Sequence, residues 1–547
     1  MLGVQPPFGR DYARSMVISL QGIAATSQAL ASQAGAQILA EGGSAVDTAI
    51  AANAVLGVVE PMMNGIGGDL FVLYWDARTQ TLSGLNASGP APCALNPQIL
   101  AGLKIQAMAE SGIHCVTVPG AVDGWAKAHA RFGKLPWNRL FRSAIAYAEQ
   151  GFPVSDIVQR LWAAAADIGK LQALPETARV FLPNNRAPRQ GEVFRNPDLA
   201  RAYRIVAEGG PAAFYQGEIA GAILATSKAT GGMMTPDDLA SFTSEWVEPI
   251  SVDYRGWRIF ELPPNGQGMA ALEMLNIMET MPADPDGPLS PAELHRRIEA
   301  MKLAYSDVNR YNGDPRHSLI PVAALLSKAY ARERAALIDP ERANGAAGHG
   351  RPAGSDTIYL AVVDREGNIA SWIQSNYASF GSGITVQGMG FVLQNRGAGF
   401  TLEPGHPNVL AGGKRPFHTI IPGFMERGDL HMGFGIMGGA NQPLAHAQFV
   451  SNVVDYGMNL QEAMEVPRFF KGDAEGYDVA IESRVPSRTF RRLSEMGHLI
   501  AERPGYSQEM GRGQAVLHDS RTGVNYAASD PRADGAATPE PISDMMS

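Results

Sequence analysis

Residues 356–371 read DTIYLAVVDREGNIAS, and this stretch decides the fold. The run TIYLAVV at 357–363 is rich in β-branched and aromatic residues, DREGN at 364–368 is a turn, and residues 369–377 form a second strand candidate, so a hairpin is predicted. The preceding segment, 339–356, is rich in glycine, alanine and proline and shows no periodicity, which predicts an exposed, mobile loop. The chain therefore changes abruptly from loop to strand at residue 357.

Helical patterns dominate the chain before this hairpin. They cover residues 27–41, 120–131, 136–150, 197–208, 217–228 and 268–281, and two further helices begin after Ser44 and Ser290. At each start an acidic residue stands three positions after the serine: Asp47 after Ser44 and Glu293 after Ser290. This spacing predicts a capping box, in which the carboxylate accepts a hydrogen bond from the backbone amide of the serine.

A second hairpin is predicted downstream, with strands at 419–425 and 430–436. Gly438 and Gly439 end it, and a helix is expected at about 441–455. Helices first and hairpins later favour a layered α+β protein of the αββα type, because the strict βαβ alternation of a doubly wound fold is missing.

The composition is that of a globular enzyme-sized protein. The 547 residues are 45% hydrophobic, which excludes extensive disorder, and they carry a net charge of −9. An acidic balance argues against a nucleic-acid partner, which needs a basic face. The two cysteines, Cys93 and Cys115, are too few for a disulfide scaffold or a cysteine-rich metal centre. We expect two core thiols, although a single bridge in an oxidising compartment stays open.

Several common functional motifs are missing. The sequence has no Walker A loop, no G-x-S-x-G elbow and no H-E-x-x-H zinc motif, and NGIGGD at 64–69 has the spacing of a tight turn rather than of a nucleotide loop. We therefore expect neither a metal nor an organic cofactor. No signal peptide is visible and no apolar stretch reaches the roughly 18 residues of a membrane span, so we expect a cytoplasmic protein without a membrane partner.

Thr357, which opens the first strand of the hairpin, could carry chemistry of its own. If the chain were cut between Asp356 and Thr357, Thr357 would carry a free α-amine beside its hydroxyl. A hydroxyl needs a base to become a nucleophile, and an α-amine, with a reference pKa of about 7.7–8.0, is partly neutral near pH 7. Most threonines after loops merely start strands, so the local pattern alone favours that interpretation.

A set of longer motifs extends along the chain. They are ILAEGGSAVDTAIAA (38–52), PGAVDGWAKA (119–128), MTPDDLASF (234–242), PISVDYRGW (249–257), DTIYLAVVDREGNIAS (356–371), FGSGI (380–384), MGGANQP (437–443) and ASDPR (528–532). With these motifs in this order, the chain closely resembles the γ-glutamyltranspeptidase family of N-terminal-nucleophile hydrolases, from about residue 16 to residue 534. The resemblance implies a four-layer αββα sandwich.

The resemblance also implies self-cleavage between Asp356 and Thr357. The fragments 1–356, ending in the loop 339–356, and 357–547 would stay interwoven in one domain as a heterodimer, and a dimer of heterodimers is allowed. Thr357 then matches the nucleophile.

Three more residues match the family's catalytic positions. Ser375 matches a second hydroxyl near the nucleophile's amine, and Gly438 and Gly439 match the paired glycines whose amides form the oxyanion hole. Locally, an outward-facing serine and an ordinary strand-to-helix turn would look the same. Paired glycines before a helix N-terminus nevertheless suit an oxyanion, because the backbone can approach closely and the helix end is electropositive.

The pocket positions depart from the family's pattern. Ser88 stands where the family has an arginine for the substrate α-carboxylate, and Gly399 where it has an aspartate for the α-amine. Tyr377 replaces an asparagine, and His418 and Thr419 replace paired serines. A serine cannot replace a bidentate arginine, so we expect free γ-glutamyl compounds to be poor substrates.

Arg396 aligns with a neutral family position and could bind a substrate carboxylate, with help from Arg415. The alternative, that both are structural ion-pair arginines, weighs equally. We expect a self-processing threonine amidohydrolase or acylase that cleaves a small carboxylate-bearing amide, of oxamate or glutaryl type, through an acyl-enzyme, with Arg396, Tyr377, His418 and Thr419 in the substrate pocket. The alternatives are a true γ-glutamyltransferase or glutathione hydrolase with a rebuilt pocket, and a non-catalytic binding homologue.

Overall fold

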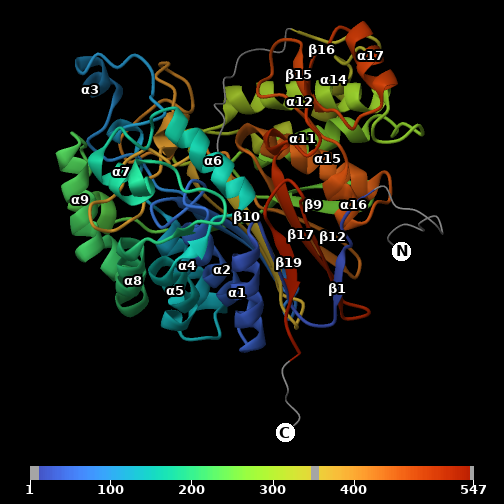
Figure 1. Ribbon diagram of the computed structural model, residues 1–547. Coiled ribbons are helices and arrows are strands. Elements are labelled where there is room, and N and C mark those ends of the chain that lie inside the picture. Colours follow the sequence, from blue (N-terminus) through green and yellow to red (C-terminus); the bar gives the residue numbers. More distant parts are fainter. Residues whose placement is uncertain (1–11, 346–355, 543–547) are drawn as a thin grey trace.

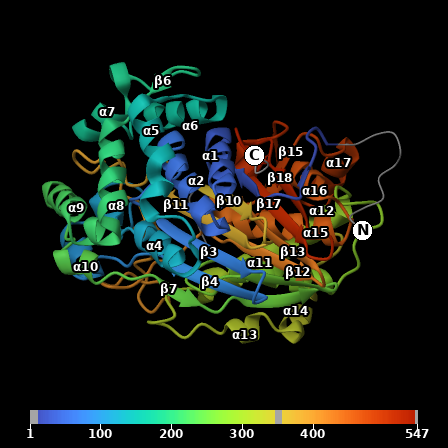
Figure 2. The same ribbon diagram turned by 90° about the horizontal axis from the view of Figure 1, so that it is seen from below.

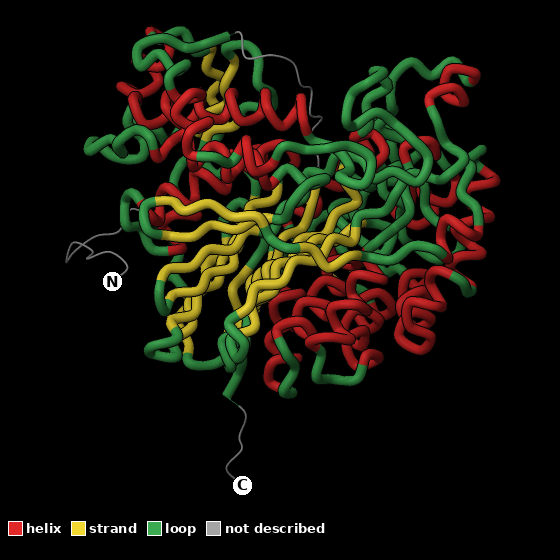
Figure 3. Tube along the Cα trace, turned by 180° about the vertical axis from the view of Figure 1, so that it is seen from behind, coloured by secondary structure: helices red, strands yellow, loops and turns green. Residues whose placement is uncertain are grey.

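The computed structural model describes residues 12–345 and 356–542. Within these ranges, most strands form two seven-stranded sheets that face each other, with helices on both outer faces (Figures 1 and 2). Seen from behind, the strands lie in the middle of the molecule with helices at its margins (Figure 3). The four-layer αββα sandwich predicted from the sequence is confirmed.

Both sheets are built from strands on either side of residue 356. The first sheet contains, in spatial order, β1 (Val17–Ser19), β18 (Val524–Ser529), β17 (Arg512–Asp519), β13 (Leu430–Met437), β12 (Gly423–Arg427), β9 (Trp257–Glu261) and β8 (Ile250–Tyr254). The second contains β19 (Ala536–Pro539), β2 (Ile23–Thr26), β10 (Asp356–Val363), β11 (Ile369–Tyr377), β3 (Asp69–Asp76), β4 (Thr81–Ala87) and β7 (Glu245–Val247). The two halves of the chain therefore share one core.

Two groups of helices cover the outer faces. The second sheet is covered by α1 (Ala29–Ala40), α2 (Ala45–Val59), α4 (Ala121–Phe132), α5 (Arg142–Gln150) and α8 (Pro197–Tyr215). The first sheet is covered by α11 (Gly268–Glu279), α12 (Pro291–Tyr311), α15 (Gln442–Val454) and α16 (Leu460–Glu465). Shorter peripheral elements are α3 (Pro97–Gly102), α6 (Asp156–Asp167), α7 (Pro175–Phe181), α9 (Glu218–Ala229), α10 (Pro236–Ala240), α13 (Val322–Leu325), α14 (Lys328–Ala335), α17 (Ser487–Glu495), β5 (Phe152–Pro153), β6 (Val193–Phe194), β14 (Phe469–Phe470), β15 (Asp478–Glu482) and β16 (Leu499–Arg503).

The core follows the alternation of β10. Ile358 and Leu360 pack in the cluster that includes α2, whereas Tyr359 and Ala361 pack in the cluster between the two sheets. A strand that is buried on both faces reads as a continuous apolar run, because side chains on both sides need an apolar partner. This is why TIYLAVV shows no polar alternation.

The predicted hairpin is confirmed: β10 pairs with β11 across the turn at 364–368. The second hairpin is formed by β12 and β13, but its first strand begins at Gly423 rather than at residue 419. The Ile421 amide donates to the Gln442 side chain at 3.0 Å, so this residue does not join the strand ladder. The predicted helix at 136–150 is divided, with a 3₁₀ turn at Trp137–Phe141 before α5.

The capping box at Ser44 is confirmed, since the Asp47 carboxylate accepts from the Ser44 amide. At Ser290 the same prediction is wrong. The Ser290 hydroxyl accepts from the Glu293 amide, but the Glu293 carboxylate is bound by Arg296 and Arg297. Two guanidinium groups on the next helical turn bind this carboxylate in place of the cap amide.

The expectation of two core thiols holds for one cysteine only. Cys115 is buried and Cys93 is exposed, and both are free. In the loop predicted at 339–356, residues 339–345 form turns with mostly exposed side chains, and residues 346–355 lie outside the described residues. None of the described helices is both long enough and apolar enough to cross a membrane.

Candidate active site

Thr357 is the second residue of β10, the strand between β2 and β11 in the second sheet. Its side chain is buried, and Thr357 Oγ1 donates a hydrogen bond to Ser375 Oγ at 3.0 Å. The pairing with β11 shifts between residues 356 and 358. Such irregularities re-aim a side chain and are frequent beside active sites. The start of this central strand therefore brings two hydroxyl groups together.

Ser375, on β11, fixes the chain that follows it. Ser375 Oγ accepts a hydrogen bond from the Tyr377 amide at 2.7 Å. Tyr377 has a φ of +78°, which is uncommon for a residue with a side chain. Backbone conformations of this kind persist where the surrounding structure enforces them, and they cluster at functional sites.

Gly438 and Gly439 lie between β13 and α15, with φ angles of +150° and +63°. A side chain is poorly tolerated at Gly438, because its Cβ would lie 3.1 Å from the Gly511 Cα. The Gln267 side-chain amide donates to the carbonyl oxygens of Gly439 at 2.8 Å and of Thr419 at 2.6 Å. The glycine turn is thus tied to the segment that precedes β12.

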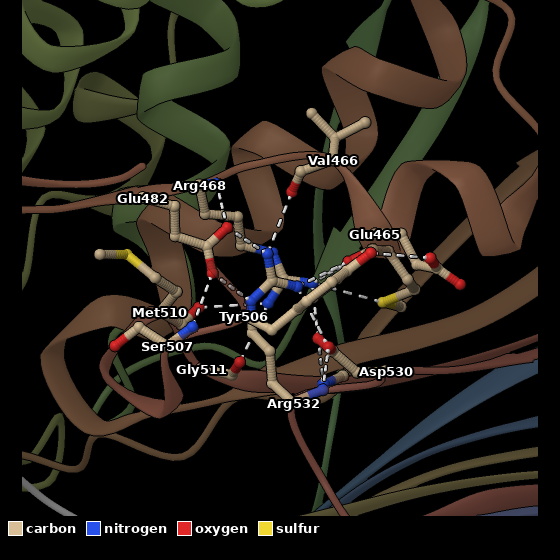
Figure 4. Close-up of polar contacts among 12 residues, drawn as sticks. Glu465, Val466, Arg468, Glu482, Tyr506, Ser507, Met510, Gly511, Asp530 and Arg532 are labelled. Carbon is tan, nitrogen blue, oxygen red and sulfur yellow. Dashed lines mark hydrogen bonds and ion pairs between the residues drawn. The ribbon is translucent and has the colours of Figure 1, made fainter. Parts of the chain in front are cut away.

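A buried ion network lies behind Gly511 (Figure 4). Arg468 donates to the carbonyl oxygen of Gly511 at 3.0 Å and to the Asp530 carboxylate at 2.7 Å. Arg532 binds Glu482 through two nitrogens, at 2.8 and 2.6 Å, and Asp530 at 3.1 Å. The ASDPR motif therefore supplies a carboxylate and a guanidinium to the scaffold against which Gly438 packs.

Arg396 is fully buried, and its guanidinium lies 4.2 Å from the centre of the Tyr377 ring. Arg396 Nη1 donates to Thr419 Oγ1 at 2.7 Å. Its Nε and Nη2 atoms have no hydrogen-bond partner among the described residues. Burial lowers the pKa of Arg396 to about 10, against the opposing effects of Tyr377 and Asp69, so the group is still cationic at pH 7.

His418 is fully buried, and both of its ring nitrogens have partners. Its Nδ1 accepts from the Ile420 amide at 3.3 Å, so its Nε2 carries the proton and donates to Asp69 Oδ2 at 3.1 Å. Burial and the nearby Arg396 cation lower the pKa of His418 well below its usual value. A neutral histidine therefore binds a buried aspartate in this part of the site.

The sequence interpretation assigned no role in the site to Asp69, which is the last residue of the glycine-rich turn predicted at 64–69. The one available signal was a carboxylate at the start of an apolar strand, since DLFVLYW opens with an acidic residue and is otherwise apolar. Burial raises the pKa of Asp69 to about 7, although Arg396 and the hydrogen bonds that Asp69 accepts lower it.

Arg415 is a structural residue. It donates to the Ser88 carbonyl oxygen and to the Glu245 carboxylate, both at 2.9 Å. Of the two interpretations left open for the pair of arginines, the ion-pair role thus describes Arg415. For Arg396, no ion pair is found among the described residues.

A cavity of about 770 Å³ opens beside the buried residues. Tyr377, Gly399, Phe400 and Phe417 are among the residues that line it, and Glu110 and Glu403 are among its polar residues. This volume is within the range of small-molecule sites. Of the four residues expected in the substrate pocket, Tyr377 lines this cavity, and Arg396, His418 and Thr419 are not among its lining residues.

The contacts found join seven of the nine expected site residues, and the other two, His418 and Gly438, are the chain neighbours of Thr419 and Gly439. Thr357 contacts Ser375, Ser375 binds the Tyr377 amide, and the Tyr377 ring stacks on Arg396. Arg396 binds Thr419, which Gln267 joins to Gly439. Asp356 pairs with Tyr377 across the two strands.

Among the described residues, one group has the spacing of a metal site: His295, Glu299 and His498. Each side chain already has a protein partner, because His295 Nδ1 and His498 Nε2 are 2.8 Å apart and Glu299 binds Lys302 at 2.7 Å. The group includes none of the residues around Thr357.

The fold is that of the N-terminal-nucleophile hydrolases. The chain belongs to the Gamma-glutamyltranspeptidase family, whose model matches residues 31–540. It is 36% identical to the glutathione hydrolase-like YwrD proenzyme of Bacillus subtilis, over 95% of this chain and 99% of that protein. It is 34% identical to the oxamate amidohydrolase proenzyme of Klebsiella pneumoniae, over 95% of this chain and 98% of that protein. The crystal structure of a cephalosporin acylase from Bacillus halodurans superposes with a TM-score of 0.90 at 41% identity, covering 98% of this chain and 99% of that one.

Proposed function

We propose that this protein is a self-processing threonine amide hydrolase that transfers a small, carboxylate-bearing acyl group from an amide to its own Thr357. The proposal depends on two features found in the same site. The Thr357 and Ser375 hydroxyl groups are in contact at 3.0 Å, and the buried Arg396 has two donors without a partner among the described residues. The first supplies a nucleophile, and the second supplies a binding group for an anion.

Self-cleavage between Asp356 and Thr357 comes first. The threonine hydroxyl attacks the preceding carbonyl, the peptide nitrogen leaves as the α-amine of Thr357, and water then hydrolyses the resulting ester. The fragments 1–356 and 357–547 remain together as a heterodimer, because both sheets contain strands from each. Separating them would expose the shared core to water.

Catalysis then uses the new α-amine as the base. It accepts the Thr357 hydroxyl proton while the oxygen attacks the substrate carbonyl, and the amides of Gly438 and Gly439 hold the oxyanion. The protonated amine returns its proton to the leaving amine. Water, or an acceptor amine, then releases the acyl group from the ester. In this cycle Ser375 orients the nucleophile and its amine.

The acyl group is bound through its carboxylate. A guanidinium that is buried without an ion-pair partner strongly favours an anionic ligand, and planar N–H donors match the geometry of a carboxylate. Tyr377 stacks on the guanidinium and Thr419 holds one of its nitrogens, so the remaining nitrogens have a fixed direction. The name of one relative supports an acidic acyl group, since an oxamate amidohydrolase acts on an amide whose acyl group carries a carboxylate.

Maturation is tested on a denaturing gel and by N-terminal sequencing. The 58.3 kDa chain should separate into two fragments, of which the smaller reads Thr-Ile-Tyr-Leu. Thr357→Ala should stay uncut and inactive, whereas Thr243→Ala, an exposed threonine, should mature normally. Active material with an unbroken chain would rule out the proposal.

The acyl group is tested with glutaryl and γ-glutamyl p-nitroanilides and with oxamate. We expect glutaryl or oxamate turnover and little turnover of the γ-glutamyl compound, because Gly399 offers no carboxylate to an α-ammonium group. A strong preference for γ-glutamyl that depends on its α-amine would instead favour a γ-glutamyltransferase. Normal maturation without turnover of any acyl amide would favour a binding protein.

A further inference from the structure

Asp69 is the most heavily hydrogen-bonded carboxylate near Arg396. It opens β3 and is fully buried. Its Oδ1 accepts from the amides of Gly89 at 3.1 Å and Gly120 at 3.2 Å, and from Gln394 Nε2 at 2.8 Å. Its Oδ2 accepts from His418 Nε2 at 3.1 Å. The carboxylate is thus the common acceptor for four separate segments of the chain.

Two of these segments carry the acyl-binding residues. Gln394 stands two residues before Arg396, and His418 directly precedes Thr419, whose hydroxyl accepts from Arg396. The contacts therefore close a ring that runs from Asp69 through Gln394 to Arg396, on to Thr419, and back through His418. In such a ring the direction of the guanidinium depends on the carboxylate, although the two groups do not touch.

In its ionised form, Asp69 also supplies charge. Arg396 has no ion-pair partner among the described residues, and the negative charge of Asp69 opposes the effect of burial on the Arg396 pKa. A counter-charge that binds the neighbours of the guanidinium stabilises the cation but leaves its Nε and Nη2 available to a ligand. A direct salt bridge would have occupied those donors.

Asp69 is poorly suited to bind a substrate ammonium group. Asp69 is fully buried, and its two oxygens already accept four hydrogen bonds from protein groups, three at Oδ1 and one at Oδ2. Asp69 therefore acts through the protein groups that it binds and not through contact with a ligand.

We propose that Asp69 is the positioning residue that gives this site its selectivity for a carboxylate-bearing acyl group, by fixing Arg396 and Thr419 through Gln394 and His418. The inference rests on the proposed function, since it takes Arg396 as the acyl-carboxylate site. It adds a determinant on β3, far in sequence from every residue assigned to the pocket.

The test compares glutaryl p-nitroanilide with pentanoyl p-nitroanilide, which has the same chain length without the carboxylate. In Asp69→Asn, the preference for the glutaryl compound in kcat/KM should fall by about 10-fold or more, mainly through a higher KM, and kcat for the pentanoyl compound should change by less than about 3-fold. The inhibition constant of free glutarate should rise in parallel. Asp76→Asn is the matched control, since Asp76 ends the same strand and binds only the exposed turn at 78–79.

Gln394→Met gives a second test that keeps the carboxylate. This variant breaks the contact between Asp69 and Gln394, so it should also lower the preference for the glutaryl compound. If Asp69→Asn fails to mature, Gln394→Met alone tests the role of Asp69. A preference unchanged in Gln394→Met and in mature Asp69→Asn, but lost in Arg396→Met, would overturn the role of Asp69 and leave the proposed function intact. If Arg396→Met also keeps the preference, the proposed function itself fails. A selective loss of γ-glutamyl turnover in Asp69→Asn would show that Asp69 binds an ammonium group instead.

Discussion

Thr357 Oγ1 lies 3.0 Å from Ser375 Oγ, and the same serine oxygen accepts the Tyr377 amide. One hydroxyl thus links the proposed nucleophile to the residue that stacks on Arg396. This relationship joins the chemical part of the site to the part that would recognise the acyl group.

Ser375→Ala should lower kcat by about 100-fold while leaving KM nearly unchanged, because the serine orients the nucleophile but does not hold the acyl carboxylate. Steady-state kinetics with glutaryl p-nitroanilide check this. Ser371→Ala is the matched control on the same strand: its hydroxyl binds Tyr359 and the Gly423 carbonyl oxygen, so it should cost stability, about 1–3 kcal/mol, and not kcat. Equal kcat losses in both variants would contradict the assigned role.

Gly438→Ala should lower kcat by about 10²–10³-fold in a folded protein, since its φ of +150° and the nearby Gly511 Cα force the backbone amide to move. Single-turnover acylation rates measure this effect. Gly428→Ala, in the open β12–β13 turn with a φ of +58°, is the control for a positive φ without a neighbouring atom in the way, and it should leave the acylation rate unchanged. A normal acylation rate in Gly438→Ala would exclude the oxyanion role.

Arg396→Lys should raise KM for the glutaryl compound by about 10- to 100-fold, even though it keeps a positive charge. A lysine has neither the planar fork nor the face that stacks on Tyr377. Titrating glutarate as a competitive inhibitor gives an independent measure of the same loss. Arg415→Lys serves as the comparison, and we expect no change in selectivity there, because Arg415 binds Ser88 and Glu245.

Arg468→Met should lower the free energy of unfolding by about 3–5 kcal/mol, because it leaves the Asp530 carboxylate with a single buried cation and the Gly511 carbonyl oxygen without this donor. Denaturant unfolding in the uncut Thr357→Ala background measures this loss on one chain. Arg492→Ala, whose partners Glu341 and Glu495 are exposed, should cost less than about 1 kcal/mol.

Stability should fall as the pH drops from about 6.5 towards 3, with a contribution from His498. Burial and the cations of Lys302 and Lys471, together with His295, lower the pKa of His498 to about 3 in the folded protein. In this window the unfolded chain binds one proton more at this residue, so the free energy of unfolding loses about 1.4 kcal/mol per pH unit from it.

His498→Gln removes that proton and keeps a donor for His295. The difference in slope between this variant and the parent, both in the Thr357→Ala background, isolates the contribution of His498. Parallel slopes would mean that His498 is already charged in the folded protein.

The central hairpin and the helix starts could be predicted from sequence because they depend on local rules. TIYLAVV has the composition of a buried strand, DREGN that of a turn, and Ser44 with Asp47 the spacing of a capping box. Prediction failed where a residue has a partner that is not evident from its neighbours in sequence. The Glu293 carboxylate binds two arginines and not the amide of its cap residue, and the Ile421 amide donates to a side chain and not to a neighbouring strand.

The sequence by itself determined the layered fold, the family and the place of Thr357 at the start of a central strand, because each follows from contiguous residues. Only the tertiary structure decided which of two similar arginines lacks an ion pair, and that a carboxylate at residue 69 binds residues 394 and 418. Those contacts join segments more than 300 residues apart. Hydrogen bonds and charge interactions depend on distance in space, which no local pattern in the chain encodes.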